Sequence, residues 1–343
     1  MKKLWLAFCW LLMGGLAACL RATPMIPESV VVIAESPVRV IAMDGPAAKA
    51  KAEISGMAWC GEHLVLLPQY PMMYADDQEP GYLFRIPAQA VDAYLLAVNP
   101  QAIQPELLPI DTKGIERLIS GFEGFESILF NGNDVYLTIE SHQDDGMMGY
   151  LVRGEVNGEC ERLEITQEEP TALPPQADLG NMSDETLVLL QDQLITIYEA
   201  NGVNVNPDPV AHRFDFSLEP SGILAMPSIE YRITDATLTD KQGEFWAVNY
   251  FFPGNAKKLK PDLDQIAIKF GLGVSHQDQD QVERLIALKF DGDRIILADK
   301  PPVYLALSGA VSRNWEGVVR YGDGFLLVTD EHPTTLLAYV GLI

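Results

Sequence analysis

The sequence is poor in cysteine and in basic residues. Each shortage argues against particular kinds of site or partner. Only 4 of its 343 residues are cysteine, which argues against a zinc site or a thiol catalyst. Lysine and arginine number 24 against 48 acidic residues, so the formal charge is −24. A surface this acidic repels nucleic acid and anionic headgroups and attracts cations. We therefore expect no nucleic-acid partner.

Several sequence signatures of catalysis are also missing. The chain has no Gly-x-Ser-x-Gly elbow, no His-Glu-x-x-His helix, no Walker loop and no dinucleotide fingerprint. Its long apolar run is the N-terminal segment "MKKLWLAFCWLLMGGLAAC", which begins with two lysines and ends in small residues before Cys19. This layout is typical of an export signal, and the run is short for a transmembrane helix.

The end of this segment, "LAAC" (16–19), resembles the lipobox of bacterial lipoproteins. The resemblance implies a signal peptide over residues 1–18, acylation of Cys19 and a tether over 19–28, leaving a single domain over 29–343. Leu20 stands where retention in the inner membrane would require Asp, which implies an outer-membrane anchor and no transmembrane helix in the mature protein. An ordinary cleaved signal with a chance cysteine is the alternative.

Five segments of the chain align without gaps. Each runs from a polar residue through an apolar strand, a Gly, Asp, Asn or Gln turn and a second apolar strand to another polar residue, as a β-hairpin does. Third and fourth strands follow several of the hairpins, for example at 210–216 and 293–299. The hairpins are "SGMAWCGEHLVLLPQ" (55–69), "ESILFNGNDVYLTIE" (126–140), "ETLVLLQDQLITIYE" (185–199), "DATLTDKQGEFWAVN" (235–249) and "EGVVRYGDGFLLVTD" (316–330).

Repeated units of four antiparallel strands predict an all-β fold, a β-propeller. Five hairpins favour five blades, while the long intervals 55–126 and 235–316 leave six blades open. The last unit lacks a fourth strand, and the segment 29–43 reads as a strand that could supply it and close the ring. A β-sandwich is the alternative, but it gives no reason for polar residues to recur at matched ends.

The polar ends of the hairpins predict a site. In a propeller the first strands line the central channel, so the first and last residues of all five hairpins should ring one mouth. Crowded carboxylates raise one another's pKa or require a countercharge, and calcium tolerates an irregular set of oxygen ligands. We predict Ca2+ as cofactor, with solvated or amide-bound acids as the alternative and with Asp184 as an alternative to Glu185. The predicted ligands are Glu126, Glu185, Asp235, Glu316, Glu140, Asn249 and Asp330.

Three stretches carry a resemblance to a known family: "GFEGFESI" (121–128), "YRITDATLTDKQGEFWAVN" (231–249) and above all "NWEGV" (314–318). They are similar to the phytase-like secreted β-propellers, described as esterase-like, and more distantly to the gluconolactonase and paraoxonase group. That resemblance implies an inner-strand acid on calcium, matched here by Glu316, Asp235 and Glu126. The acidic mouth departs from propeller phytases, which line theirs with lysine and arginine.

Two histidines and two cysteines complete the candidates. His142 and His332 each lie two residues beyond the end of a hairpin, where a general base would be placed, although exposed loop histidines are common. Cys60 and Cys160 should lie in turns on the face opposite the mouth. They could form one disulfide, but their placement in turns does not establish the required separation.

Two functions fit these observations. One is a lipid-anchored, metal-dependent hydrolase of an ester, lactone or phosphoester. The other is a non-catalytic propeller at the cell envelope that binds a small-molecule or envelope ligand. A fold of this kind hosts both.

Overall fold

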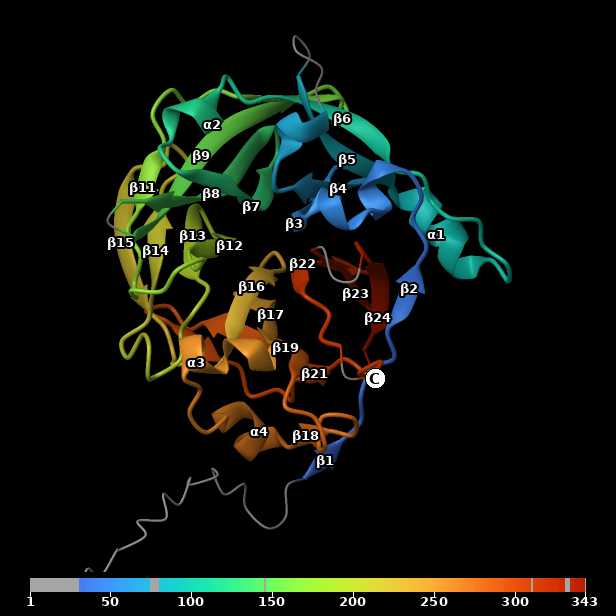
Figure 1. Ribbon diagram of the computed structural model, residues 1–343, viewed down its shortest axis with the longest axis vertical. Coiled ribbons are helices and arrows are strands. Elements are labelled where there is room, and N and C mark those ends of the chain that lie inside the picture. The colour runs from blue at the N-terminus through green and yellow to red at the C-terminus, as the bar shows by residue number, and fades with distance from the viewer. Residues whose placement is uncertain (1–30, 75–79, 145, 310, 331–333, 343) are drawn as a thin grey trace, which may run out of the picture.

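The computed structural model describes residues 31–74, 80–144, 146–309, 311–330 and 334–342, and the chain is mostly β. Its strands form antiparallel units arranged around a common centre, as Figure 1 shows. This confirms the predicted β class.

The first two units come from the N-terminal half of the chain. Strands β6 and β10, the last of each unit, pair in parallel, so the two units share one nine-stranded sheet with β11 (Thr171–Leu173) on β9. The units are β3 (Ile54–Cys60), β4 (His63–Pro68), β5 (Gly81–Pro87), β6 (Glu106–Asp111), and β7 (Phe122–Asn131), β8 (Asp134–Gln143), β9 (Gly146–Asn157), β10 (Arg162–Ile165).

The third and fourth units have separate sheets. Strand β21 (Val303–Tyr304) adds to β19 in the fourth. The units are β12 (Asp184–Leu190), β13 (Gln193–Tyr198), β14 (Val210–Phe214), β15 (Pro220–Ala225), and β16 (Arg232–Ala236), β17 (Glu244–Phe251), β19 (Val282–Phe290), β20 (Ile295–Leu297).

The fifth unit joins the two ends of the described chain. Strands β22 (Trp315–Tyr321), β23 (Gly324–Thr329) and β24 (Leu337–Gly341) are completed by β2 (Arg39–Ile41), which pairs antiparallel with β24. The predicted closing strand is therefore present. Ile41, opposite Leu337, is buried in the core shared with the first unit.

Packing between units closes the ring. The first strand of each unit contacts that of the next, and β22 contacts β3. Each of the five interfaces between neighbouring units buries its own apolar cluster, which is why the strands read as apolar runs. The described residues form no sixth unit: the long intervals hold helices and extra strands instead.

Helical segments lie in the connections. The sequence patterns gave no sign of them. They are α1 (Ala88–Leu96), α2 (Ile115–Leu118), α3 (Ala256–Leu259), α4 (Gln265–Phe270) and the 3-10 turns Pro46–Ala48, Ala50–Ala52, Pro71–Tyr74 and Pro253–Asn255. Helices α3 and α4 belong to the insertion between β17 and β19, which also carries β18 (Leu272–Gly273), the parallel partner of β1 (Val32–Ile33). No helix in the described ranges is long and apolar enough to cross a membrane.

Cys60 and Cys160 form a disulfide, with their Cα atoms 6.0 Å apart. It joins the end of β3 to the turn between β9 and β10, and thereby the first unit to the second. The sequence left this pairing open, because only the ring brings two turns 100 residues apart together.

Candidate functional site

The five predicted first-ring residues share one local geometry. In each hairpin the pairing register shifts at the start of the first strand, and the ring residue falls within that shift. A β-bulge leaves its extra residue out of the ladder and turns its side chain. The residues concerned are Ser55, Glu126, Glu185, Asp235 and Glu316.

These bulges place a crowd of carboxyl groups at one end of the channel. Glu126, Glu185 and Glu316 are 5–7% exposed, and Glu199 is fully buried. Glu185 lies in the bulge, whereas Oδ1 of the alternative ligand, Asp184, accepts a hydrogen bond from Thr196 Oγ1 (2.7 Å) within its own unit.

A buried arginine supplies the countercharge. Arg232, the first residue of β16, forms ion pairs with Glu199 through Nε and with Glu316 and Glu185 through Nη2, at 3.1 and 3.5 Å. Its Nη1 donates to Asn314 Oδ1 at 3.0 Å. These partners come from the third and fifth units and Arg232 from the fourth, so one guanidinium joins three neighbouring units at the mouth.

Two other ring members tie neighbouring units together. Ser55 Oγ donates to the carbonyl of Phe125 (2.5 Å), and Asp235 Oδ2 accepts from the backbone N–H of Val318 (2.7 Å). The polar atoms of Ser55 and Asp235 therefore form hydrogen bonds between the first strands of neighbouring units.

The closing residues of the hairpins are also engaged. Asn249 Oδ1 accepts from Arg284 Nε at 2.9 Å, while its amide donates to the carbonyls of Glu230 and Arg232. Asp330 Oδ2 accepts from Asn314 Nδ2 at 3.3 Å.

Glu126 and Glu140 make no ion pair with the described residues. Glu126 Oε1 accepts from Gln69 Nε2 at 2.8 Å. Glu140 Oε1 is buried without a hydrogen-bond partner among the described residues. An unsatisfied buried oxygen of this kind is costly, so it needs a proton, a water or a ligand.

The pKa values of these carboxyls follow from burial. Desolvation raises the pKa of Glu126 well above its usual value, and the charges of Glu140 and Glu185 raise it further. Burial and Glu123 raise the pKa of Glu140 to about 7. For Glu316 burial outweighs Arg232, and the pKa is about 7.

Glu185 and Asp235 follow the same rule. Burial raises the pKa of Glu185 to about 8 although Arg232 opposes the shift. The pKa of Asp235 is also raised by burial, against the backbone hydrogen bond from Val318. Near neutral pH, several groups at the mouth can thus carry or release a proton.

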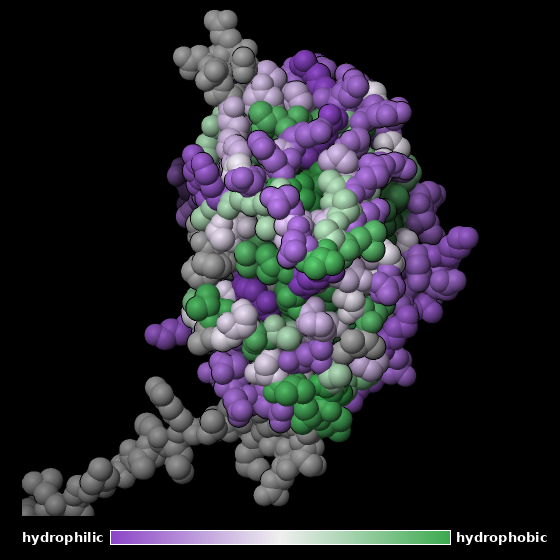
Figure 2. All heavy atoms as spheres, turned by 90° about the vertical axis from the view of Figure 1, so that its right-hand side faces the viewer, coloured by the Kyte–Doolittle hydropathy of each residue, from purple (hydrophilic) through white to green (hydrophobic). Residues whose placement is uncertain are grey.

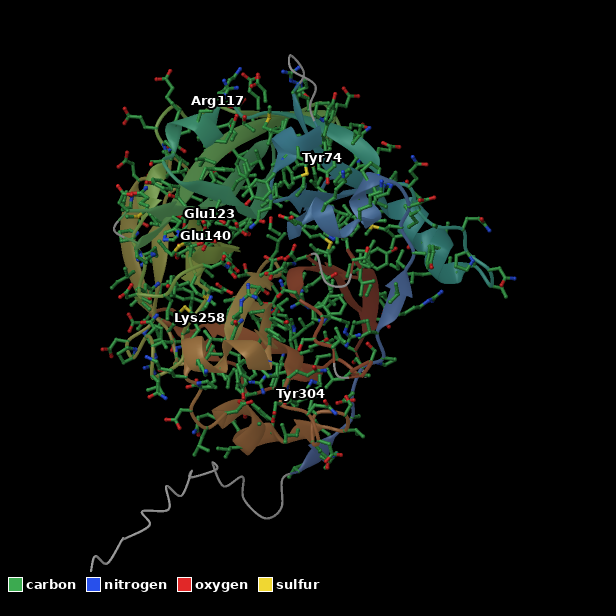
Figure 3. The ribbon with its side chains drawn as sticks, in the orientation of Figure 1. Tyr74, Arg117, Glu123, Glu140, Lys258 and Tyr304 are labelled. Atoms are coloured by element: carbon green, nitrogen blue, oxygen red, sulfur yellow. A yellow bond between two sulfur atoms is a disulfide. The ribbon has the colours of Figure 1, made fainter. Side chains whose placement is uncertain are left out.

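The insertion between β17 and β19 reaches this mouth. The pKa of Lys258, on α3, is lowered by burial and by Arg232 and raised by Glu140 and Glu185. Its Nζ donates to the carbonyl of Gly180 at 2.9 Å. Figure 3 labels Lys258 by α3 and, above it on the same side of the ring, Glu123 and Glu140.

The two candidate bases are placed differently. His142 lies at the end of β8 with a side chain 60% exposed, and its Nδ1 is 3.7 Å from Glu123 Oε1. It is therefore a rim residue of the mouth, beside Glu123 and Glu140. His332 lies outside the described residues, so its role stays a prediction.

Several oxygen atoms of the predicted calcium site already have partners within the protein. Calcium takes about six to eight oxygen ligands. Here the guanidinium of Arg232 lies among three of the carboxylates, and the oxygen of Asn249 already accepts from Arg284. Across the described ranges, no three His, Cys, Asp or Glu side chains are already arranged as a metal site. The donor set fits a buried arginine better than calcium, and calcium binding stays a prediction.

Sequence reasoning missed Arg232 and Glu123. Arg232 stands three residues before Asp235, just outside the aligned hairpin, so the repeat gave no reason to weigh it. The available signal was charge: seven acids at one mouth required a cation, and a basic residue beside an inner strand was the nearest source.

No protein-family model matches the sequence, and no curated protein matches it either. The resemblance to phytase-like propellers therefore stays a prediction.

Several solved structures are similar in shape. An exo-β-1,3-galactanase from Phanerochaete chrysosporium is 8% identical, with a TM-score of 0.49, over 89% of this chain and 64% of its own. An α-L-arabinofuranosidase from Clostridium thermocellum is 10% identical, with a TM-score of 0.43, over 80% and 81%. One from Lactobacillus brevis is 10% identical, with a TM-score of 0.44, over 87% and 92%. The chain thus spans less than two thirds of the galactanase.

Proposed function

We propose that the chain is a five-bladed β-propeller hydrolase that cleaves an uncharged or cationic substrate, an ester or a lactone, by proton transfer between carboxyl groups at its acidic mouth. One observation carries the proposal. A carboxyl without an ion-pair partner in the described chain, Glu126, faces the same mouth as a carboxyl held by arginine, Glu316. Because their environments differ, the two groups can take different roles.

The roles follow from the surroundings. Glu126, whose pKa is raised well above its usual value by burial and by the charges of Glu140 and Glu185, is the proton donor to the leaving group. Glu316, oriented by Arg232 and with a pKa of about 7, is the base that takes a proton from water. The excess of acids disfavours a phosphoester, since its charge would be repelled.

The test uses Glu126→Gln and Glu316→Gln with Glu161→Gln, an exposed residue, as matched control. The substrates are neutral esters and lactones with a phosphoester beside them. We expect each mouth variant to lose about 10²–10⁴-fold in turnover and the control to keep it. Full turnover in either mouth variant would contradict the roles. The same assay after chelation, with calcium then added back, tests the calcium prediction: turnover that requires calcium would contradict the arginine-held site.

A binding module is the second candidate, and a specific observation favours it. The carboxyls are only 5–7% exposed, and three cavities of the described chain, of 700, 570 and 210 Å3, lie elsewhere. A chain that binds a neutral ligand in one of these cavities and turns over none of the substrates would support the binding module.

We also propose that the chain is exported and anchored through an acylated Cys19 in the outer membrane. The Cys60–Cys160 disulfide supports export, because such bonds persist in oxidising compartments.

A further inference from the structure

The described chain begins on the insertion that carries α3 and α4. Strand β1 pairs in parallel with β18, with Val32 opposite Leu272. Gly271, at the end of α4, is glycine because a Cβ there would lie 2.2 Å from the carbonyl oxygen of Val31. The chain from the predicted tether therefore reaches the fold against the end of α4.

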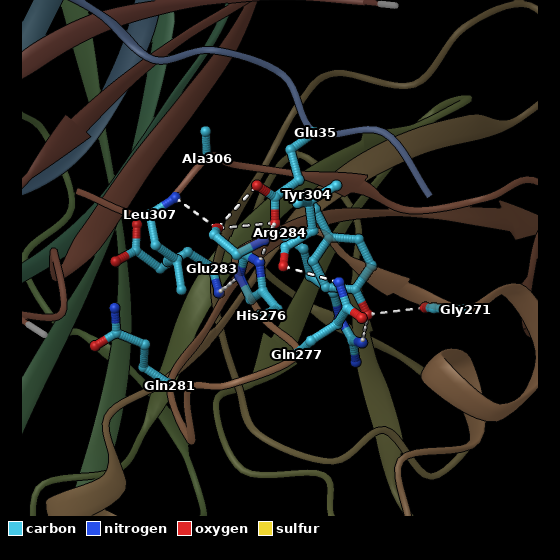
Figure 4. Close-up of polar contacts among 12 residues, drawn as sticks. Glu35, Gly271, His276, Gln277, Gln281, Glu283, Arg284, Tyr304, Ala306 and Leu307 are labelled. Atoms are coloured by element: carbon cyan, nitrogen blue, oxygen red, sulfur yellow. Dashed lines mark hydrogen bonds and ion pairs between the residues drawn. The ribbon is translucent and has the colours of Figure 1, made fainter. Parts of the chain in front are cut away.

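A polar cluster holds the chain there. Glu35 accepts hydrogen bonds from the backbone N–H and Oγ of Ser275, at 2.8 and 2.9 Å, and lies 2.7 Å from His276 Nδ1. Figure 4 shows Glu35 over His276 and Tyr304. Because Glu283 N–H donates to His276 Nε2, the ring proton sits on Nδ1 and points to Glu35. These contacts hold residues 31–36, which we call the strap, against the insertion.

Apolar side chains are exposed around this attachment. Val31 and Val32 are 65% and 47% exposed, Ile268 on α4 is 48% exposed, and Val274, just after β18, is 58% exposed. We call these four residues the strap patch. Figure 2 shows apolar side chains gathered at the end of the molecule where β1 lies. Single exposed apolar side chains are common on protein surfaces. Several together, as at the strap patch, are typical of a surface that binds a protein or a membrane.

The charge of the insertion differs from that of the whole chain. Residues 252–281, which form the insertion, hold four lysines (257, 258, 260 and 269) and four aspartates (262, 264, 278 and 280), so the insertion is neutral in a chain of −24. Lysines flanking exposed apolar side chains are typical of segments that lie at a lipid headgroup boundary.

The short predicted tether indicates what covers the strap patch. Eleven residues separate Cys19 from Val31, so the two can be at most about 40 Å apart. We propose that the strap patch docks on the bilayer that holds the acylated Cys19, with the exposed Lys257, Lys260 and Lys269 at the phospholipid headgroups. The inference rests on the proposed anchor. It also brings the mouth, which α3 borders, beside the membrane surface.

The test uses the full acylated chain reconstituted in phosphatidylethanolamine and phosphatidylcholine vesicles. A single cysteine replaces Val274 and carries an environment-sensitive fluorophore. The matched control carries it at Ile223, which is 60% exposed on β15, in another unit. We expect a several-fold rise in emission on reconstitution at position 274 and little change at 223. Adding Ile268→Asp, an exposed change, should reduce the rise.

Flotation of the same vesicles separates the two proposals. A chain that does not float contradicts the anchor and the docking with it. A chain that floats while both labels respond alike overturns the docking alone.

Discussion

At the scale of single residues, Arg232 supplies the positive charge that holds the carboxylates of the mouth together. It is buried and pairs with three carboxylates from the two units on either side of its own. Such a residue makes the mouth a charge network rather than a set of independent acids. Removing one partner of a buried ion pair leaves the others uncompensated, which costs far more than an exposed pair is worth.

The first prediction follows from this. Arg232→Met should lower the free energy of unfolding at pH 7.5 by about 3–5 kcal/mol, since the carboxylates lose their countercharge. The control Arg294→Met removes an exposed pair with Asp291 and should stay close to the parent protein. Urea denaturation measures both. At pH 5 the loss should be smaller, because the carboxyls are then largely protonated. Equal stability of the two variants would mean that Arg232 is not the countercharge.

At the scale of elements, the bulges and the closing strand matter most. Each first strand carries its bulge at the same end, and this aims five ring residues at one mouth. The closing strand β2 has only three residues, yet it completes the fifth unit and covers the last edge.

The second prediction concerns β2. Ile41→Ala should lower the free energy of unfolding by about 2–5 kcal/mol, because Ile41 is 1% exposed in the core between the fifth and first units. Val40→Ala, the neighbour that is 47% exposed, should cost much less. If urea midpoints of the two variants coincide, β2 does not close the ring in solution.

At the scale of the whole molecule, the raised pKa values of the buried carboxyls make the free energy of unfolding depend on pH. The pKa values of Glu140 and Glu316 rise from 4.5 to about 7 on folding. Between these values the native state binds more protons than the unfolded chain, so stability falls as pH rises. The effect of each carboxyl is on the order of 3 kcal/mol, and it is complete above pH 7.

The third prediction is therefore a higher urea midpoint at pH 5 than at pH 8. Glu140→Gln removes one of the titrating groups, so the difference between the urea midpoints at pH 5 and pH 8 should be smaller. Glu161→Gln changes an exposed residue and should leave that difference unchanged. A midpoint that rises from pH 5 to pH 8 would show that the mouth carboxyls are ionised throughout.

The hairpin repeat, the β class, the closing strand and the ring positions could all be predicted from the sequence. Each is a local signal: a hairpin lies within fifteen residues, and its polar ends mark one side of it. The helices of the insertion were missed, since α3 and α4 are four and six residues long and show no repeat.

What the sequence alone determined was which residues stand at the mouth; what occupies the space between them was decided by the tertiary structure. Arg232 meets Glu316 across 84 positions and Cys60 meets Cys160 across 100. Pairing at such separations depends on how the units close into a ring, and no local pattern records it. The same closure buries the acids, and burial in turn sets their pKa values and their chemistry.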